Sequence, residues 1–143
     1  MIKNERQYKI TRSRAAEVCC TLGELQRTPL ADGLQTEMRK LQLDALCGTL
    51  GDLGAELAEY DALHDATLIE ATGIEQLPIA LIRARIACGL TQRQLAERVG
   101  LHEQAIQRYE ATDYAGVSFA RLVEVADALD LTIHYDVRLT QAS

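Results

Sequence analysis

The chain has 143 residues, of which 48% are hydrophobic and 25% charged, and its formal net charge is −6 at pH 7. This length fits one domain or two small ones, and the hydrophobic fraction is too high for a globally disordered chain. Leu and Ala are abundant while Trp is absent, which favours an all-α fold. No apolar run nears the roughly 20 residues of a membrane span, and the polar start lacks a signal-peptide pattern, so we expect a cytoplasmic protein.

The charge is distributed unevenly along the chain. Residues 1–14 carry a net charge of +4, whereas residues 15–77 carry −9 from twelve acidic and three basic side chains. Residues 78–116 carry +1 and residues 117–143 carry −2. The overall acidity therefore does not exclude a nucleic-acid partner for residues 78–116. It does argue against non-specific binding, because attraction to phosphates scales with local positive charge.

The first half of the chain predicts a helical hairpin. RQYKIT, at residues 6–11, fits an extended arm, and Thr11 is a suitable N-cap for the helix that follows. The apolar positions of that helix repeat at helical spacing: Ala15, Val18, Cys19, Leu22 and Leu25. Pro29 and Gly33 both disfavour its continuation.

A longer helix is predicted from about Leu34 to Leu63. Its larger apolar residues are spaced alternately three and four apart, as in a heptad seam: Leu43, Leu46, Leu50, Leu53, Leu57 and Tyr60. The glycines Gly48, Gly51 and Gly54 each weaken a helix by about 1 kcal/mol relative to Ala, so either they permit a close helix contact or the helix bends there. We assign residues 1–70 to a hairpin for dimerisation or partner binding, and residues 71–143 to a second domain.

The second domain opens with strong helix signals. Pro78 suits the first turn of a helix that ends at Gly89. Thr91 and Gln94 fit a capping box at the start of a second helix, and Gly100 supplies its C-terminal stop.

A third helix is predicted from His102 to about Glu110, and Ser118 caps a fourth. The apolar face of the third helix buries Ala105, Ile106 and Tyr109. The 3.6-residue period leaves Glu103, Gln104, Gln107 and Arg108 on its outer face.

A family resemblance covers about 50 residues, roughly 80–129: LIRARIACGLTQRQLAERVGLHEQAIQRYEATDYAGVSFARLVEVADAL. This segment resembles the Cro/repressor-type helix-turn-helix family, often called XRE. The matching positions lie in register: Gly89-Leu90-Thr91-Gln92, Leu95-Ala96, Val99-Gly100, Ile106 and Glu110. The resemblance implies a lambda-repressor-like helical bundle whose third helix enters the major groove of double-stranded DNA.

Carried onto this sequence, the resemblance implies a set of DNA contacts. The implied base readers are Glu103, Gln104, Gln107 and Arg108. Gln pairs with adenine, Arg with guanine, and Glu accepts from cytosine. The implied phosphate contacts are Gln92, Arg93, His102, Thr112 and Tyr114. The alternative interpretation is a solvated helix face.

Three positions depart from the family pattern. His102 lies where a small capping Ser or Thr is usual, and Glu103 places an acid toward a polyanion. Asp130 replaces the common glycine after the last helix. The first two bear on affinity and base preference rather than on the fold.

The C-terminal segment, residues 131–139, predicts a short β-strand because apolar and polar residues alternate strictly. It resembles the strand of HipB-type antitoxins, which implies pairing across a homodimer through Leu131, Ile133, Tyr135 and Val137. The rival pairing partner is the chain's own RQYKIT. A homodimer is expected in either case, because one helix-turn-helix reads too few bases and two-fold dimers read inverted-repeat operators.

The arrangement of basic start, acidic hairpin and DNA-binding module resembles HigA-like antitoxins. That resemblance implies a small basic ribonuclease toxin as partner, and the acidity of residues 15–77 suits a basic protein. The alternatives are a plain dimerisation hairpin, a ligand-sensing repressor, and a helix-turn-helix that serves as a protein–protein interaction scaffold. We expect no enzyme activity, metal or cofactor, for three reasons. The histidines are scattered along the chain, at His64, His102 and His134. The cysteines lack the spacing of a zinc site, and the sequence has no Gly-rich phosphate loop.

Overall fold

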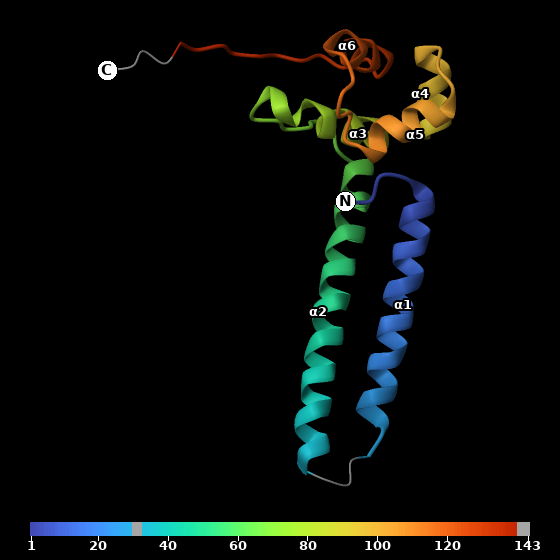
Figure 1. Ribbon diagram of the computed structural model, residues 1–143, viewed down its shortest axis with the longest axis vertical. Coiled ribbons are helices and arrows are strands. Elements are labelled where there is room, and N and C mark those ends of the chain that lie inside the picture. The colour runs from blue at the N-terminus through green and yellow to red at the C-terminus, as the bar shows by residue number, and fades with distance from the viewer. Residues whose placement is uncertain (30–32, 140–143) are drawn as a thin grey trace. The chain divides into compact units, whose positions relative to one another are not determined.

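The computed structural model describes residues 1–29 and 33–139, which form two units that divide between Ile69 and Glu70 (Figure 1). Within the described residues every regular element is helical, as the composition predicts. None of these helices is long and apolar enough to cross a membrane.

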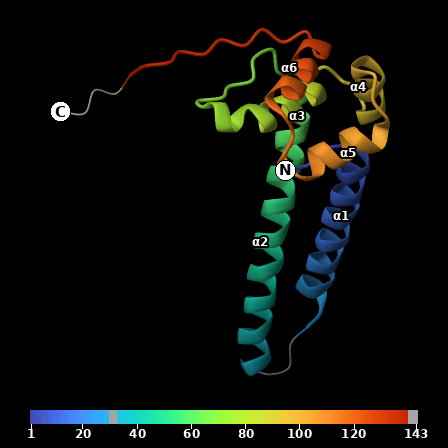
Figure 2. The ribbon, with the colours of Figure 1, turned by 45° about the horizontal axis from the view of Figure 1, so that its top comes forward.

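The first unit is an antiparallel hairpin of α1, Glu5–Arg27, and α2, Gly33–His64, which lie side by side in both views (Figures 1 and 2). The predicted extended arm at residues 6–11 is wrong, because these residues belong to α1. The helix begins early because the side chain of Asn4, not Thr11, caps it by accepting from the Gln7 N–H at 2.9 Å. The rival strand pairing with this segment is therefore ruled out.

The contact between α1 and α2 follows the predicted heptad seam. On α1 the half-buried side chains lie at spacings of three and four: Tyr8, Thr11, Ala15, Val18, Leu22 and Leu25. Gly23, next to Leu22, is half-buried as well. On α2 the predicted seam residues are half-buried from Leu43 to Leu57, and Tyr60 is buried. The rings of Tyr8 and Tyr60 lie 5.0 Å apart, and the Tyr8 hydroxyl donates to Asp61 at 3.2 Å. Two helices alone thus make a thin core, with no residue of α1 fully buried.

The three glycines of α2 do not interrupt the helix, which runs from Gly33 through His64. A Cβ built on Gly48, Gly51 or Gly54 meets no atom within 4 Å. Within the described residues, therefore, no other helix lies close to any of these three glycines.

The second unit is a small bundle that opens with the 3-10 turn η1, Ile74–Gln76. Its helices are α3, Leu77–Ala87, α4, Gln92–Val99, α5, Glu103–Ala111, and α6, Phe119–Ala128 (Figure 1). The most buried apolar side chains come from every one of these helices: Leu81, Ile82, Ile86, Leu95, Ile106 and Val125. The apolar side chains of the short helices thus converge on one core, in which α4 packs against both α5 and α6, and α6 also packs against α3.

The predicted strand at residues 131–139 is wrong for the single chain, because these residues form no strand. The tail leaves α6 after the Leu131 N–H bonds the Ala126 carbonyl at 3.1 Å, and it then runs outward (Figure 1). Its apolar residues stay accessible: Ile133 and Tyr135 are 40% and 46% exposed, and Val137 and Leu139 are 91% and 93% exposed. The alternation of apolar and polar residues predicts which side chains share a face, but a strand also needs a second strand to bond its backbone. The proposed partner within the chain, residues 6–11, is helical and cannot serve as that second strand.

Candidate nucleic-acid interface

The helices α4 and α5 form a helix-turn-helix whose geometry follows from local sequence signals. Thr91 and Gln94 make the predicted capping box, since the Gln94 N–H donates to Thr91 Oγ1 at 3.1 Å and the Thr91 N–H to Gln94 Oε1 at 2.9 Å. Gly100 adopts φ 75° and ψ 33°, the left-handed conformation that glycine accepts without strain. The chain reverses there, and the Leu101 N–H bonds the Ala96 carbonyl at 2.8 Å.

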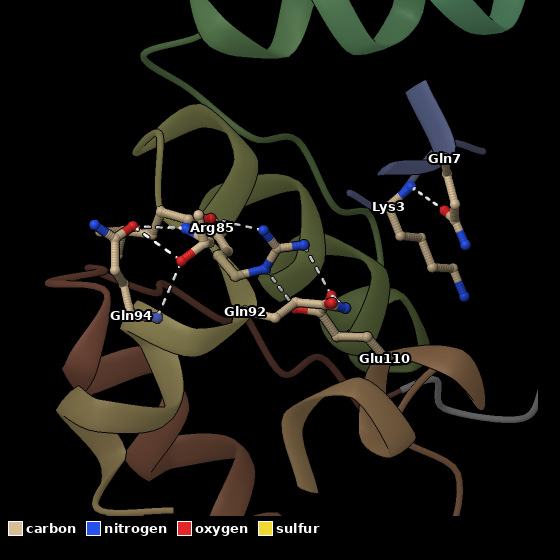
Figure 3. Close-up of polar contacts among 8 residues, drawn as sticks. Lys3, Gln7, Arg85, Gln92, Gln94 and Glu110 are labelled. Carbon is tan, nitrogen blue, oxygen red and sulfur yellow. Dashed lines mark hydrogen bonds and ion pairs between the residues drawn. The ribbon is translucent and has the colours of Figure 1, made fainter. Parts of the chain in front are cut away.

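A buried polar cluster joins three helices behind this turn (Figure 3). Arg85 of α3 and Glu110 of α5 form a two-pronged ion pair, with Nε–Oε1 at 2.6 Å and Nη2–Oε2 at 2.8 Å. Arg85 is 2% exposed and Glu110 is fully buried. Gln92 of α4 donates from Nε2 to Glu110 Oε2 at 2.8 Å, and Arg85 Nη1 donates to the Leu90 carbonyl at 2.7 Å.

This cluster fixes the position of α5, because a buried carboxylate is stabilised only when its lone pairs accept hydrogen bonds. Glu110 was expected from the family register, whereas Arg85 was missed. The one available signal was that the run LIRARIA sets two arginines, Arg83 and Arg85, among apolar residues, and the structure buries Arg85 and leaves Arg83 half-buried. A charged residue at such a position indicates a buried partner, but the sequence does not say which acid it is.

The four predicted base readers all lie exposed on α5. Gln107 Nε2 donates to Glu103 Oε1 at 3.1 Å, one helical turn away, so these two side chains are preordered together. The Arg108 guanidinium lies 5.9 Å from the centroid of the Tyr109 ring. The structure thus brings a carboxylate, two amides and a guanidinium onto one surface, which supplies the donors and acceptors that base edges recognise.

The predicted phosphate contacts divide into different environments. Gln92 is half-buried at the start of α4 and is held by Glu110, whereas Arg93 is exposed and pairs with Glu97 at 3.1 Å. His102 is the exposed N-cap residue of α5 but makes no side-chain cap hydrogen bond. The Thr112 hydroxyl donates to the Arg108 carbonyl at 3.1 Å, at the C-terminal end of α5.

The phosphate prediction for Tyr114 is wrong, because its side chain is buried, with 3% of it exposed. Its ring lies 5.9 Å from that of Tyr109, and its hydroxyl has no hydrogen-bond partner among the described residues. Burial, and then the nearby Glu110 carboxylate, raise the pKa of the Tyr114 phenol. The position looked polar in the loop sequence, but the left-handed backbone at Asp113 and Tyr114, with φ of 50° and 56°, turns the ring inward.

A shallow pocket of about 510 Å³ lies beside the C-terminal end of α5. Its lining includes Arg108, Thr112, Ser118 and Arg121. Ser118 caps α6 by accepting from the Arg121 N–H at 3.3 Å, so a helix N-terminus opens here next to two guanidinium groups. Arg121 was missed because its position in the sequence is that of an ordinary helix-surface residue, and only the fold brings it to the same pocket as Arg108. Its guanidinium pairs with Glu124 of the same helix.

Residues 81–135 match a family model described as helix-turn-helix. This segment is a helix-turn-helix domain of the Cro/repressor type. The resemblance in the sequence is thereby confirmed, and the function class of the segment is that of DNA-binding transcription regulators. Comparisons with curated proteins and with solved structures gave no match. Among the residues that the structure describes, no group of three or more potential metal ligands comes together.

Proposed function

We propose that the protein is a sequence-specific repressor that binds an inverted-repeat operator as a homodimer, in the cytoplasm where that DNA lies. The observation that carries the proposal is the face of α5, where Glu103, Gln104, Gln107 and Arg108 are exposed together. Each recognition helix enters the major groove, and half-sites lie about 10 base pairs apart.

Phosphate contacts fix the register of this helix on the duplex. We assign them to Gln92 and Arg93 at the N-terminus of α4, to His102 and Thr112 at the ends of α5, and to Arg121. The N-terminus of α4 favours an anion through its free N–H groups. The residue that replaces Tyr114 in this role is Arg121, whose guanidinium lines the same pocket as Arg108.

The homodimer is supported by apolar side chains that the single chain leaves uncovered in its tail. Leu131 is half-buried, but Ile133, Tyr135 and Val137 are exposed at alternate positions. We propose that a second copy covers them. An Ile133→Pro variant should weaken self-association in sedimentation, whereas an unchanged sedimentation profile contradicts a role for the tail.

The test of DNA binding is a titration against the upstream promoter fragment of the gene and against a scrambled fragment, at two salt concentrations. The proposal predicts tight binding to the promoter, weaker binding to the scrambled fragment, and a modest fall in promoter affinity with salt. Equal affinity for both fragments contradicts sequence-specific repression.

A second candidate role, as an antitoxin, is favoured by the net charge of −9 on residues 15–77. Such a surface steers a basic protein toward the chain and disfavours acidic ones. Co-expression with the product of the neighbouring reading frame tests this role. Relief of that product's toxicity together with co-purification is expected, and co-expression without either effect contradicts it.

A further inference from the structure

The contacts along the hairpin fix which residues of α1 and α2 lie level with each other. The rings of Tyr8 and Tyr60 are in contact, with centroids 5.0 Å apart, and the helices run antiparallel from there (Figures 1 and 2). Cys19 lies eleven residues after Tyr8, and Thr49 lies eleven residues before Tyr60. Cys19 is therefore level with Thr49, and it is offset along the hairpin by only about 3 Å from Cys47, at 1.5 Å per residue.

Cys19 and Cys47 also occupy equivalent places beside the seam, because each directly follows a seam residue of its helix. Arg12 lies one heptad before Cys19, and Asp61 lies two heptads after Cys47. Both of these charges act on the Tyr8 hydroxyl: its hydrogen bond to Asp61 raises the pKa of the phenol, and the Arg12 guanidinium lowers this pKa. Arg12 and Asp61 thus share one side of the seam, and the two cysteines lie on that same side.

The residues that directly precede a seam residue lie on the other side. Thr21 and Gln42 are such residues, and both line a groove along the hairpin together with Leu46. Cys47 is the next residue after Leu46 but does not line that groove, and neither does Cys19. The groove and the two thiols therefore flank opposite sides of the seam.

The separation of the two helices decides which chemistry the thiols can share. Packed helices lie about 8–10 Å apart, which sets the Cβ atoms of two such flanking residues about 7–9 Å apart. A disulfide needs Cβ atoms about 3.5–4.5 Å apart, so it would require the helices to shift by several Å. A metal ion bonded to both sulfur atoms, with metal–sulfur bonds of about 2.3 Å, extends the span between the Cβ atoms to about 6–7 Å. A bridging metal ion is therefore the better fit.

The surroundings of the two thiols leave them open to an incoming ion. Both cysteines are free and exposed. Ala16 lies one turn before Cys19, and Gly51 lies one turn after Cys47. A Cβ built on Gly51 meets no atom within 4 Å, so the described residues leave the space next to Cys47 open.

The charges near the two thiols are of both signs. Arg27 Nη2 lies 3.1 Å from the position that a Cβ would take on Gly23, one turn after Cys19. Asp44 lies one turn before Cys47. The guanidinium and the carboxylate together place no net charge beside the pair.

Two thiols without a third ligand restrict the choice of metal. Among the described residues no three potential metal ligands come together, whereas structural zinc sites use four. Soft thiolates favour Cu(I), which accepts two of them in a linear arrangement. No spacing motif in the sequence reveals such a site, because its two ligands come from different helices.

We propose that Cys19 and Cys47 together bind one Cu(I) ion per chain, which bridges α1 and α2 beside their seam. Each thiol releases its proton to water as its sulfur bonds the ion, so the complex carries one negative charge and no electron is transferred. Cys20 is not a ligand, because the helical period turns it about 100° from Cys19, away from α2. This site depends neither on DNA binding nor on the tail.

Anaerobic titration of the reduced full-length chain with Cu(I), against a coloured chelator that competes for the ion, tests the site. The wild type should bind one tightly held ion per chain. Cys19→Ser and Cys47→Ser should each lower the affinity about 100-fold or more, since even residues behind a metal ligand contribute about 10–100-fold. Cys20→Ser is the matched control, because it removes an exposed thiol next to Cys19, and it should keep the wild-type affinity. Cys88→Ser, in the second unit, should do the same.

Further measurements test whether the ion forms a bridge within one chain. X-ray absorption should report two sulfur neighbours around the copper. Hydrogen exchange of the α1 and α2 amides should slow when Cu(I) is added to the wild type, because the ion joins the two helices, and should not change in Cys47→Ser. Sedimentation should show the same oligomeric state with and without Cu(I). All four variants should retain helical circular dichroism, since each replaces an exposed thiol.

Several outcomes overturn the proposal. One is an equal loss of affinity in Cys20→Ser and Cys19→Ser, and another is binding that Cys19→Ser and Cys47→Ser leave intact. A rise in mass on addition of Cu(I) overturns it as well, because the ion would then join thiols of two chains. Formation of a disulfide between Cys19 and Cys47 in air, with no Cu(I) bound by the reduced chain, overturns it in favour of a redox pair.

Discussion

Replacing Glu110 by Gln should destabilise the second unit strongly. The substitution keeps the shape of the side chain but removes the charge that Arg85 Nε and Nη2 contact at 2.6 and 2.8 Å. It also turns one acceptor into an amide donor, which then faces Arg85 or the Gln92 amide. Removing one partner of a buried ion pair costs about 3–5 kcal/mol. Total stability of a domain is only about 5–15 kcal/mol, so a large part of it is lost.

The assay is thermal unfolding of the full-length chain together with hydrogen exchange of amides in α3–α6, which reports on the second unit alone. A loss of this size should lower its midpoint by more than about 12 °C, at roughly 4–8 °C per kcal/mol. The matched control is Glu97→Gln, which breaks the exposed pair with Arg93 at 3.1 Å. Exposed pairs contribute about 0–1 kcal/mol, so the control should move the midpoint by less than about 8 °C.

The double variant Arg85→Met/Glu110→Leu should recover most of the stability lost in Glu110→Gln, because well-packed apolar residues replace a buried ion pair without penalty. It should still bind all DNA more weakly, since Gln92 loses the carboxylate that holds its amide. If Glu110→Gln unfolds no more readily than Glu97→Gln, the reasoning about the buried cluster is refuted.

Further substitutions test the site and its backbone. Gln92→Ala should weaken binding to cognate and scrambled DNA alike. Arg108→Ala should relax specificity at one base position, with a loss of discrimination of about 1–3 kcal/mol. If both variants lose affinity equally for the two fragments, these roles are contradicted. Tyr114→Phe should leave DNA affinity unchanged and raise stability by about 1 kcal/mol in denaturant titration, since it removes a buried hydroxyl without a hydrogen-bond partner among the described residues. Burial raises the pKa of Tyr114 in the folded chain above the ordinary value of 10.0, so the unfolded chain loses this proton first as the pH rises past 10.0. The wild type should therefore lose stability relative to Tyr114→Phe above that pH, and parallel plots of stability against pH for the two proteins contradict this. Asp130→Gly should stabilise the chain by about 1 kcal/mol because φ is 53° at residue 130, and Gly100→Ala should destabilise it by a similar amount because φ is 75° at residue 100. A lower midpoint of thermal unfolding for Asp130→Gly, or a higher midpoint for Gly100→Ala, contradicts the backbone argument.

The helix-turn-helix was predictable because its signals are local. Thr91 and Gln94 lie three residues apart, and Gly100 ends the helix that they begin. The heptad seam of α2 was predictable for the same reason, since the spacing of its leucines is visible without knowledge of the fold. The start of α1 was mispredicted because Thr11 and Asn4 are both suitable caps, and the structure uses the earlier one.

Features that depend on distant residues were not predictable. Arg85 and Glu110 are 25 positions apart, and only the folded bundle shows that they meet. Tyr114 turns inward because of backbone angles that its neighbours in sequence do not reveal. The alternation in residues 131–139 specified a face but not a strand partner, and so the predicted strand is not formed by the single chain.

The most direct test of the central claim is a titration of a Gln104→Ala/Arg108→Ala variant against the promoter fragment and its scrambled control, beside the wild type. Both residues are exposed on α5, so hydrogen exchange of α3–α6 should match the wild type. If the face of α5 reads base edges, the variant should bind the two fragments with nearly equal affinity while the wild type discriminates between them. Unchanged discrimination by the folded variant would mean that α5 is not the recognition helix.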